Sequence, residues 1–196
     1  MTIPISEAKR LFRKKEAEKI RMWHPYAGTS RIRILPNPSD KDRFWKDVKV
    51  HWDRDTGKYK PCEKHCPLCA EYDHGDRNKK PYEKVLLNIY DYYDGKVKVW
   101  LAGERVMKQL LDFCNRSNDG NIAHPTKGQD LEISKEEANP FVRFQIRALD
   151  QSQVKLKNIE SELYHLNKVA SKMFVRNKQK PKKMLRMVQV SNTWED

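Results

Sequence analysis

The residues best suited to chemistry in this sequence are one histidine and three cysteines in a short segment. They follow the pattern His51-x10-Cys62-x3-Cys66-x2-Cys69. A Cys-x2-Cys turn supplies two thiolates to one ion, and Zn²⁺ takes four such nitrogen and sulfur ligands in a tetrahedron. Because four protein ligands leave no open position, we expect one structural zinc per chain and no activated water.

Three histidines compete for the place of the fourth ligand. His65 is adjacent to Cys66, and neighbouring residues rarely point at one ion. His74 follows Cys69 by four residues and is geometrically possible. His51 ends a predicted strand, so it would join a flexible cysteine turn to a rigid sheet. We therefore expect His51 to be the ligand and keep His74 as the alternative.

A disulfide is the main alternative chemistry for these cysteines. The first residues, MTIPISEAKR, contain no apolar segment typical of a secretion signal. This favours a reducing, cytoplasmic location, where disulfides are rare. Metal binding is therefore the preferred interpretation. The remaining thiol, Cys114, lies on the apolar stripe of a predicted helix and is expected in the core.

The chain is strongly basic. Its 196 residues include 40 Lys and Arg against 27 Asp and Glu, a formal net charge of +13. A compact body with this charge repels itself unless a polyanion neutralises it, so nucleic acid is the expected partner. No apolar run approaches the roughly 18 residues that a membrane span needs, so no membrane partner is expected.

Aromatic residues are interleaved with lysine and arginine, the combination that binds single strands. Cationic side chains hold the phosphates while bases stack on aromatic faces, with little regard to sequence. Alternation places Trp100 on the face of Lys98 rather than on the aliphatic face. The residues expected to contact DNA are Arg31, Arg33, Lys49, Tyr59, Lys79, Lys80, Tyr82, Lys98, Trp100, Phe141, Arg143 and Arg147.

Nothing in the sequence indicates an enzyme. The carboxylates that flank the cysteines each adjoin a basic residue or a turn glycine, which is typical of solvated loops. The sequence contains no P-loop, nucleophile elbow or dinucleotide motif. The predicted helices have no clear face for reading base edges, so sequence-specific duplex binding is less favoured. RNA binding and a zinc-stabilised protein-interaction module stay open as alternatives.

A mainly β body with some helix is expected to position these side chains. Alternation of apolar and polar residues predicts strands at 29–35, 47–52, 84–92, 96–101, 129–133 and 141–148, and apolar stripes predict helices at 104–114 and about 158–174. Alternation also places Trp52 in the core with Val48 and Val50. The order suits an elaborated OB-fold barrel, which has a helix between its third and fourth strands. A different α+β sheet is the alternative.

The charge distribution divides the chain into three parts. We expect a basic N-terminal arm at 1–24 and an OB-fold core at 25–150, with a zinc-binding insertion at about 51–80. Residues 151–196 form a C-terminal helix and a basic tail.

These residues resemble the single-stranded DNA-binding, helix-destabilising protein of T-even-type phages. The likeness begins at Arg31-Ile32-Arg33-Ile34-Leu35-Pro36 and continues through His51 and the three cysteines. It ends at Asn139–Ala148, close to the family's late Asn-Phe-Val strand, and so covers about 29–150. The spacings between the metal ligands are shorter here.

The resemblance implies an OB-fold with a zinc subdomain bound by one His and three Cys in this order. It implies coating of single-stranded DNA in phage replication, recombination or repair, in the bacterial cytoplasm, with a DNA-facing aromatic at Trp100. A basic N-terminal arm for self-association would correspond to residues 7–21. The resemblance also implies replication proteins as partners, which the family recruits through an acidic C-terminal tail. The sequence reads Trp194-Glu195-Asp196 after a basic stretch, so either this recruitment is not expected or the tail has been removed.

Overall fold

The computed structural model describes residues 19–116, 122–124, 127–138, 141–151 and 159–176. Most of the predicted N-terminal arm and most of the predicted basic tail therefore lie outside the described residues. No helix within the described ranges is both long enough and apolar enough to cross a membrane.

The fold is mainly β, with one mixed eight-stranded sheet. The strands are β1 (Met22–Trp23), β2 (Gly28–Leu35), β3 (Trp45–Asp53), β4 (Lys58–Pro61), β5 (Pro81–Asp91), β6 (Lys96–Gly103), β7 (Gln129–Ala138) and β8 (Phe141–Gln151). The helices are α2 (Pro67–Asp73), the 3₁₀ turn η1 (Arg77–Lys79), α3 (Glu104–Arg116), α4 (Ile159–Glu162) and α5 (Leu166–Arg176). All six predicted strands and the helix after β6 are thereby confirmed, with longer bounds.

The strands lie in the order β1-β6-β5-β2-β7-β8, with β3 beside β5 and β4 beside β3. Only β1 and β6 run parallel; the other pairs are antiparallel. Among the described residues no pairing joins β8 back to β1 or β6, so the sheet is open.

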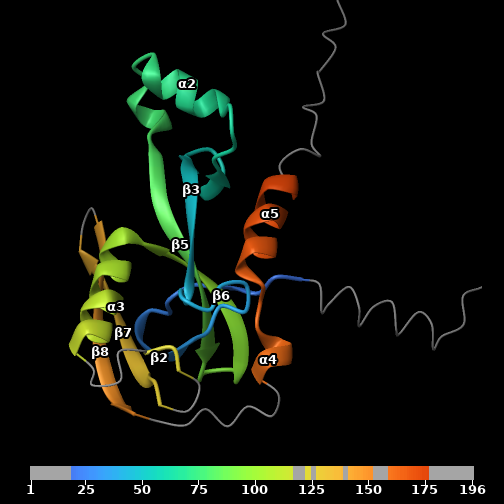
Figure 1. The fold of residues 1–196 in the computed structure, drawn as a ribbon. Coiled ribbons are helices and arrows are strands. Elements are labelled where there is room, and N and C mark those ends of the chain that lie inside the picture. Colours follow the sequence, from blue (N-terminus) through green and yellow to red (C-terminus); the bar gives the residue numbers. More distant parts are fainter. Residues whose placement is uncertain (1–18, 117–121, 125–126, 139–140, 152–158, 177–196) are drawn as a thin grey trace, which may run out of the picture.

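Strand β5 organises the sheet because it has three neighbours. Its first half pairs with β3, its second half pairs with β2 on the same edge, and β6 runs along the other edge. The chain between β2 and β5 therefore leaves the main sheet as a β3–β4 ribbon and returns through α2 and η1. We call residues 51–80 the lobe; it stands at the top of Figure 1.

Two apolar clusters cover opposite faces of the sheet. The larger one packs α3 against the sheet and includes Trp100 and Leu110. The smaller one packs α5 against β5 and β6 through Leu86, Val99 and Leu166. Because each cluster uses a different face, β5 and β6 are buried on both sides.

This arrangement contradicts the prediction that Trp100 faces DNA. Its side chain is only 3% exposed and packs edge-on against Trp23, with ring centroids 4.9 Å apart. Alternation correctly separates the two faces of β6, but α5 covers the aliphatic face while the sheet and α3 enclose the face of Trp100. Trp23, which the predicted boundary at 24 assigned to the arm, is itself 1% exposed in this core.

The prediction that Trp52 lies in the core is also wrong. Val50 is fully buried, but Trp52, two residues further along the same face of β3, is 39% exposed. The ribbon extends past the apolar cluster beneath α5, so the same face of one strand is buried at one end and exposed at the other.

The predicted helix at about 158–174 is two helices separated by residues 163–165. Within that break, the side chain of Asn88 bonds to both backbone groups of Tyr164: Asn88 Nδ2 donates to the carbonyl at 2.8 Å, and Tyr164 N–H donates to Asn88 Oδ1 at 3.2 Å. These bonds occupy backbone groups that a continuous helix would use, so they explain the interruption.

Candidate metal centre and nucleic-acid interface

The four predicted metal ligands meet at the base of the lobe. His51 Nε2 lies 3.4 Å from Cys66 Sγ and 3.5 Å from Cys69 Sγ, and the sulfurs of Cys62 and Cys69 are 3.4 Å apart. All four ligand atoms fall within 4.8 Å of one another. Within the described ranges this is the group that could hold a metal ion, and His74 is not part of it.

Backbone contacts orient the histidine toward the sulfurs. His51 is 1% exposed, and its Nδ1 lies 2.7 Å from the carbonyl oxygen of Lys79 in η1. Donation by Nδ1–H to that carbonyl leaves Nε2 with a free electron pair pointing at the thiols. On the other side, Cys62 N–H donates to the carbonyl of Lys49 at 2.7 Å, which ties the end of β4 to β3.

The Cys66–Cys69 turn has the form of a metal knuckle. Cys66 is the N-cap of α2, Pro67 occupies its first turn, and Cys69 N–H donates to the Cys66 carbonyl at 3.1 Å. Burial raises the pKa of Cys66, but backbone N–H groups of Cys69 and Leu68 outweigh it, so this pKa is lowered overall. The turn thus stabilises a thiolate, the form that binds metal.

The thiol of Cys62 needs a nearby cation to lose its proton. Burial, the hydrogen bond with Cys69 and the charge of Cys66 raise the pKa of Cys62 to about 12. Three thiolates this close repel one another unless a positive ion lies between them. One neutral imidazole and three thiolates form a donor set that Zn²⁺ favours, and the set is closed, so an ion here is structural.

Beside the metal ligands the ribbon and the neighbouring strand β5 present three aromatic rings, which we call the aromatic triad: Trp52, Tyr59 and Tyr82. The Trp52 and Tyr59 centroids are 4.9 Å apart at 64°, and those of Tyr59 and Tyr82 are 6.5 Å apart at 75°. Trp52 and Tyr82 are 39% and 41% exposed, and Lys84 Nζ lies 4.4 Å from the Tyr59 centroid. The structure thus brings together two predicted contacts and one missed residue.

Strand register explains the triad. Trp52 is directly opposite Tyr59 on β4, and Val50 is opposite Tyr82 on β5, so all three rings lie on one face of the sheet formed by β4, β3 and β5. The signal for Trp52 in the sequence was its position immediately after His51, at the end of the strand where the lobe begins.

Three of the predicted lysines lie in the lobe or next to it: Lys49, Lys79 and Lys80. Lys49 is exposed but alternates with Val50, so it lies on the face opposite the triad. Lys80 is exposed, and Lys79 forms an ion pair with Glu71 at 3.8 Å.

The prediction that Arg33 contacts DNA is wrong. Its side chain is fully buried, and its guanidinium donates to Asp130 Oδ1 at 3.1 Å. Arg31 is 54% exposed, but its Nε donates to the same carboxylate at 3.0 Å and its guanidinium covers the Tyr92 ring. Asp130 lies opposite Arg33 on β7, a pairing that the pattern of a single strand cannot reveal.

The prediction that Lys98 contacts phosphate is also wrong. Its side chain is 12% exposed, and its ammonium donates to Asp91 at 2.7 Å and to Asp94 at 2.8 Å. Tyr26 Oη also donates to Asp91, at 2.7 Å. Burial raises the pKa of Asp91, but the bonds from Lys98, Tyr26 and the Tyr93 N–H outweigh it and lower the pKa.

We therefore expect Lys98→Met to act on stability rather than on binding. Removing a donor from the buried Asp91 carboxylate should cost about 1–3 kcal/mol of unfolding free energy. Because the folded pKa of Asp91 is lowered, its stabilisation is present above the ordinary Asp pKa of about 4 and is lost as pH falls further. Urea unfolding from pH 2 to 7 should show this acid-side loss reduced in the variant. An unchanged profile would contradict the assignment.

Two predicted contacts lie on β8 with side chains outside the described part of the structure: Phe141 and Arg143. Arg147, further along the same strand, is 73% exposed and forms an ion pair with Glu132 at 3.4 Å. Its charge is therefore partly compensated.

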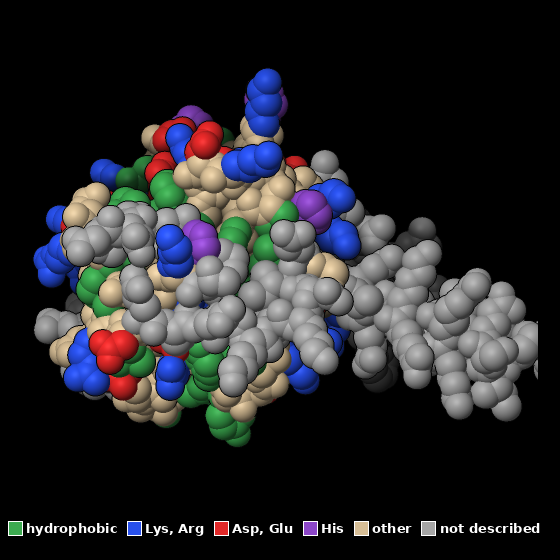
Figure 2. All heavy atoms as spheres, turned by 60° about the horizontal axis from the view of Figure 1, so that its bottom comes forward, with side chains coloured by type: hydrophobic (Ala, Val, Ile, Leu, Met, Phe, Trp, Pro, Cys, Tyr) green, Lys and Arg blue, Asp and Glu red, His purple; other side chains and the backbone are tan. Residues whose placement is uncertain are grey.

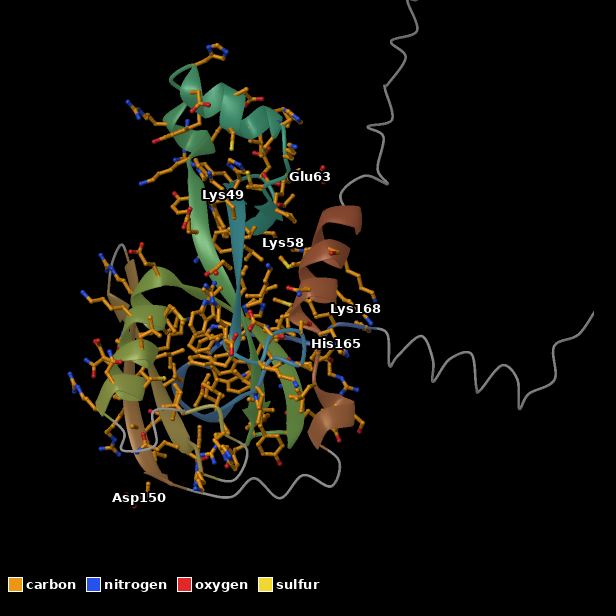
Figure 3. All side chains as sticks on the ribbon, viewed as in Figure 1. Lys49, Lys58, Glu63, Asp150, His165 and Lys168 are labelled. Carbon is orange, nitrogen blue, oxygen red and sulfur yellow. The ribbon has the colours of Figure 1, made fainter. Side chains whose placement is uncertain are left out.

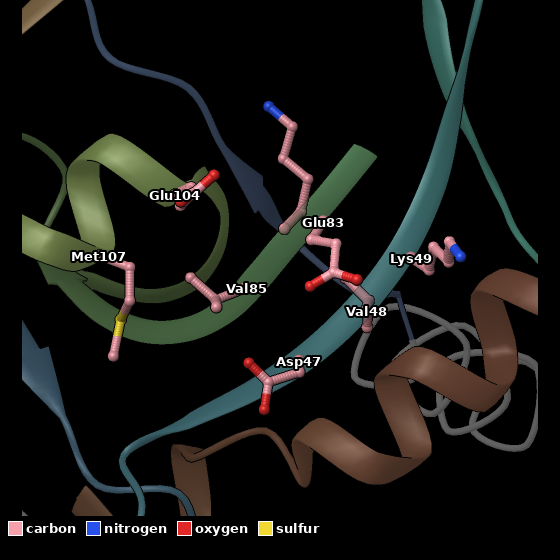
Figure 4. A pocket seen from close by; sticks show the side chains of 8 residues that line it. Asp47, Val48, Lys49, Glu83, Val85, Glu104 and Met107 are labelled. Atoms are coloured by element: carbon pink, nitrogen blue, oxygen red, sulfur yellow. The ribbon is translucent and has the colours of Figure 1, made fainter. Parts of the chain in front are cut away.

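A cavity of about 380 Å³ lies on the face of the ribbon opposite the triad, next to α3 (Figure 4). Val48, Val85 and Met107 contribute apolar lining, Asp47, Glu83 and Glu104 contribute three carboxylates, and Lys49 and Lys84 contribute two basic side chains. A phosphate here would meet side chains of both signs, so this cavity offers no uniformly cationic track for a nucleic-acid backbone. The two faces thus differ in chemistry: one is hollowed and of mixed charge, and the other is aromatic.

The fold and the site define a mainly β protein with a His/Cys₃ cluster that can hold a metal ion. In sequence comparisons no family model and no curated protein matches the chain.

Proposed function

We propose that this chain is a single-stranded DNA-binding protein with little sequence preference and a structural zinc. The observation that carries this proposal is the aromatic triad. Two of its rings, Trp52 and Tyr82, are exposed on a sheet surface and Tyr59 is half-buried between them and Lys84, next to a metal centre that can fix the backbone of the lobe. Exposed rings beside lysines are the surface on which bases of any sequence stack.

The position of the lobe in the fold supports the same proposal. Taking β2, β5, β6, β7 and β8 as the five strands of an OB-fold, α3 lies between the third and the fourth, as that fold requires. An OB-fold is a partly open barrel, so an open sheet is compatible with it. The lobe then replaces the loop between the first two strands, one of the loops through which OB-folds bind oligonucleotides.

Charge and resemblance extend the proposal. Lys and Arg side chains are spread over the face seen in Figure 2, in line with the net charge of +13. The resemblance to the T-even-type phage family favours DNA over RNA. It also favours a role in coating single strands during replication, recombination or repair in the bacterial cytoplasm, with self-association through the basic arm.

Fluorescence titration tests the proposed function. Tryptophan emission should change on adding oligo(dT), and log affinity should fall linearly with log salt by about 0.7 per neutralised phosphate. Mixed-sequence duplex should bind more weakly at equal salt, and its melting temperature should fall in the presence of the protein. Stronger binding to poly(U) would favour the RNA alternative. Absence of binding to any nucleic acid would leave the zinc-stabilised interaction module.

Trp52→Ala should weaken binding to oligo(dT) by about 1–3 kcal/mol, the value of one lost base stack. Its salt dependence should stay unchanged because no charge is removed. Trp52→Phe should retain part of the affinity. The matched control is Tyr93→Ala, which removes an 82% exposed ring at the β5–β6 turn, away from the lobe. Equal losses in Trp52→Ala and Tyr93→Ala would contradict the assignment of the triad.

A further inference from the structure

We propose that helix α5 forms the phosphate-binding edge of the interface whose base-stacking part is the aromatic triad. The ligand of this edge is the sugar-phosphate backbone of the single strand, and the side chains that would bind it are Lys168 and Lys172. This inference rests on the proposed function and names a second element of the same site.

The first step is that α5 and the triad lie on the same face of the ribbon. Along β5, Tyr82 and Leu86 are four residues apart and point to one side, and Leu86 is in the apolar cluster beneath α5. At about 3.3 Å per residue, this separates the triad from the α5 contact by about 13 Å. Helix α5 also contacts β3 and β4, the strands of Trp52 and Tyr59, and stands beside them in Figure 1.

The second step is that α5 is anchored on one side and cationic on the other. Leu166, Val169 and Ala170 are buried against the sheet. Lys168 and Lys172 are four residues apart, so they share a helix face, and both are exposed. Figure 3 shows Lys168 with its neighbour His165 on the outer side of α5, away from the sheet.

The third step is that this charge is uncompensated locally. Residues 163–176 contain no Asp or Glu. In the described part of the chain neither Lys168 nor Lys172 forms an ion pair, whereas Lys98 and Arg33 are each held by carboxylates. The exposed face of α3 is mixed, because Glu104 and Asp112 accompany its basic residues. A lysine ammonium without a carboxylate partner is a ready point charge for phosphate.

Together these three observations indicate a path for the single-stranded DNA across the protein surface. Bases stack on Trp52 and Tyr82, and the backbone turns toward the outer side of α5, away from the carboxylates of the opposite face. Arg33 and Lys98, which the sequence predicts as DNA contacts, contribute little, since each is already paired with a carboxylate. Helix α5 is therefore part of the binding surface and is not merely a support for β5 and β6.

The test compares two double variants that remove the same charge. Lys168→Gln with Lys172→Gln removes two positive charges from α5, and Arg105→Gln with Lys108→Gln removes two from the exposed face of α3. Binding of the full chain to oligo(dT) is measured by fluorescence at several salt concentrations. The α5 variant should lower the magnitude of the log-log salt slope by about 1.4, that is about 0.7 for each lost phosphate contact, and the α3 variant should leave it unchanged.

The outcomes separate this inference from the proposed function. An unchanged slope in the α5 variant, or equal decreases in both double variants, would overturn the role of α5. If the unaltered chain fails to bind oligo(dT), or Trp52→Ala has no effect, the proposed function itself fails. Thermal unfolding checks that both double variants fold. If the double variant does not fold, the single variants Lys168→Gln and Lys172→Gln replace it. Each of them should lower the magnitude of the salt slope by about 0.7.

Discussion

Cys66→Ser should abolish the binding of one zinc per chain and release the lobe from the sheet. None of residues 52–80 is buried, so the lobe has no apolar core of its own. Its order must come from the pairing of β3 with β4 and from the ion. Structural zinc contributes about 10–16 kcal/mol of apparent binding free energy in small zinc-folded peptides, so its loss here should be large and local.

Metal analysis and hydrogen exchange measure this effect. Amides of the lobe should exchange much faster in Cys66→Ser, while those of β2 and β6 stay protected by the two apolar clusters. Binding to oligo(dT) should weaken, since Trp52 and Tyr59 lie on the lobe. Cys114→Ser is the matched control, because this cysteine lies outside the metal group, and it should retain a full equivalent of zinc. A full equivalent in Cys66→Ser would refute the ligand assignment.

Trp100→Ala should lower the unfolding free energy by about 3–5 kcal/mol, the cost of removing a large aromatic side chain from a packed core. The indole is 3% exposed and contacts Trp23, whose own side chain is 1% exposed. The substitution would leave a cavity in the larger apolar cluster, which also contains Trp23 and residues of α3. This is the opposite of what an exposed, DNA-facing ring would produce.

Urea unfolding of Trp100→Ala and Trp52→Ala, side by side, tests this expectation. Trp52→Ala should be nearly as stable as the unaltered chain, because its ring is 39% exposed. Affinity per folded molecule should follow the reverse order, with the loss in Trp52→Ala. A stable Trp100→Ala variant with lost affinity would restore Trp100 to the DNA-facing surface and exclude the core assignment.

The metal site was predictable from sequence because its chemistry is local. Three of the four ligands lie within eight positions, and few arrangements other than metal binding explain such thiol spacing. The choice of His51 over His74 followed from one strand prediction, and the structure brings His51 to the sulfurs. The contact that orients its ring, the carbonyl of Lys79, is 28 residues away and carries no signal in residue type.

The predicted DNA contacts were less accurate because they assumed that a cationic face is a solvent face. Arg33 and Lys98 both lie on such faces, but each meets a carboxylate from another strand or turn, Asp130 and Asp91. The basic neighbours of Tyr59 and Tyr82 in the sequence predict them as DNA contacts. Trp52 shares its strand face with Val48 and Val50, so the same pattern predicts it in the core. Whether a face is covered depends on the helices that pack on it, α3 on one side of the sheet and α5 on the other.

The sequence sufficed to predict the position and type of the six main strands, the helix after β6 and the metal-binding group. The strands, the helix and the three cysteines depend on residues within a few positions of one another, through alternation, an apolar stripe or a cysteine turn, whereas His51 was chosen because it ends a predicted strand. The tertiary structure alone decided which faces are covered, because α3 and α5 pack on opposite sides of β5 and β6. Burial depends on what packs against a strand. Trp100, expected at the surface, is therefore buried, and Trp52, expected in the core, is exposed.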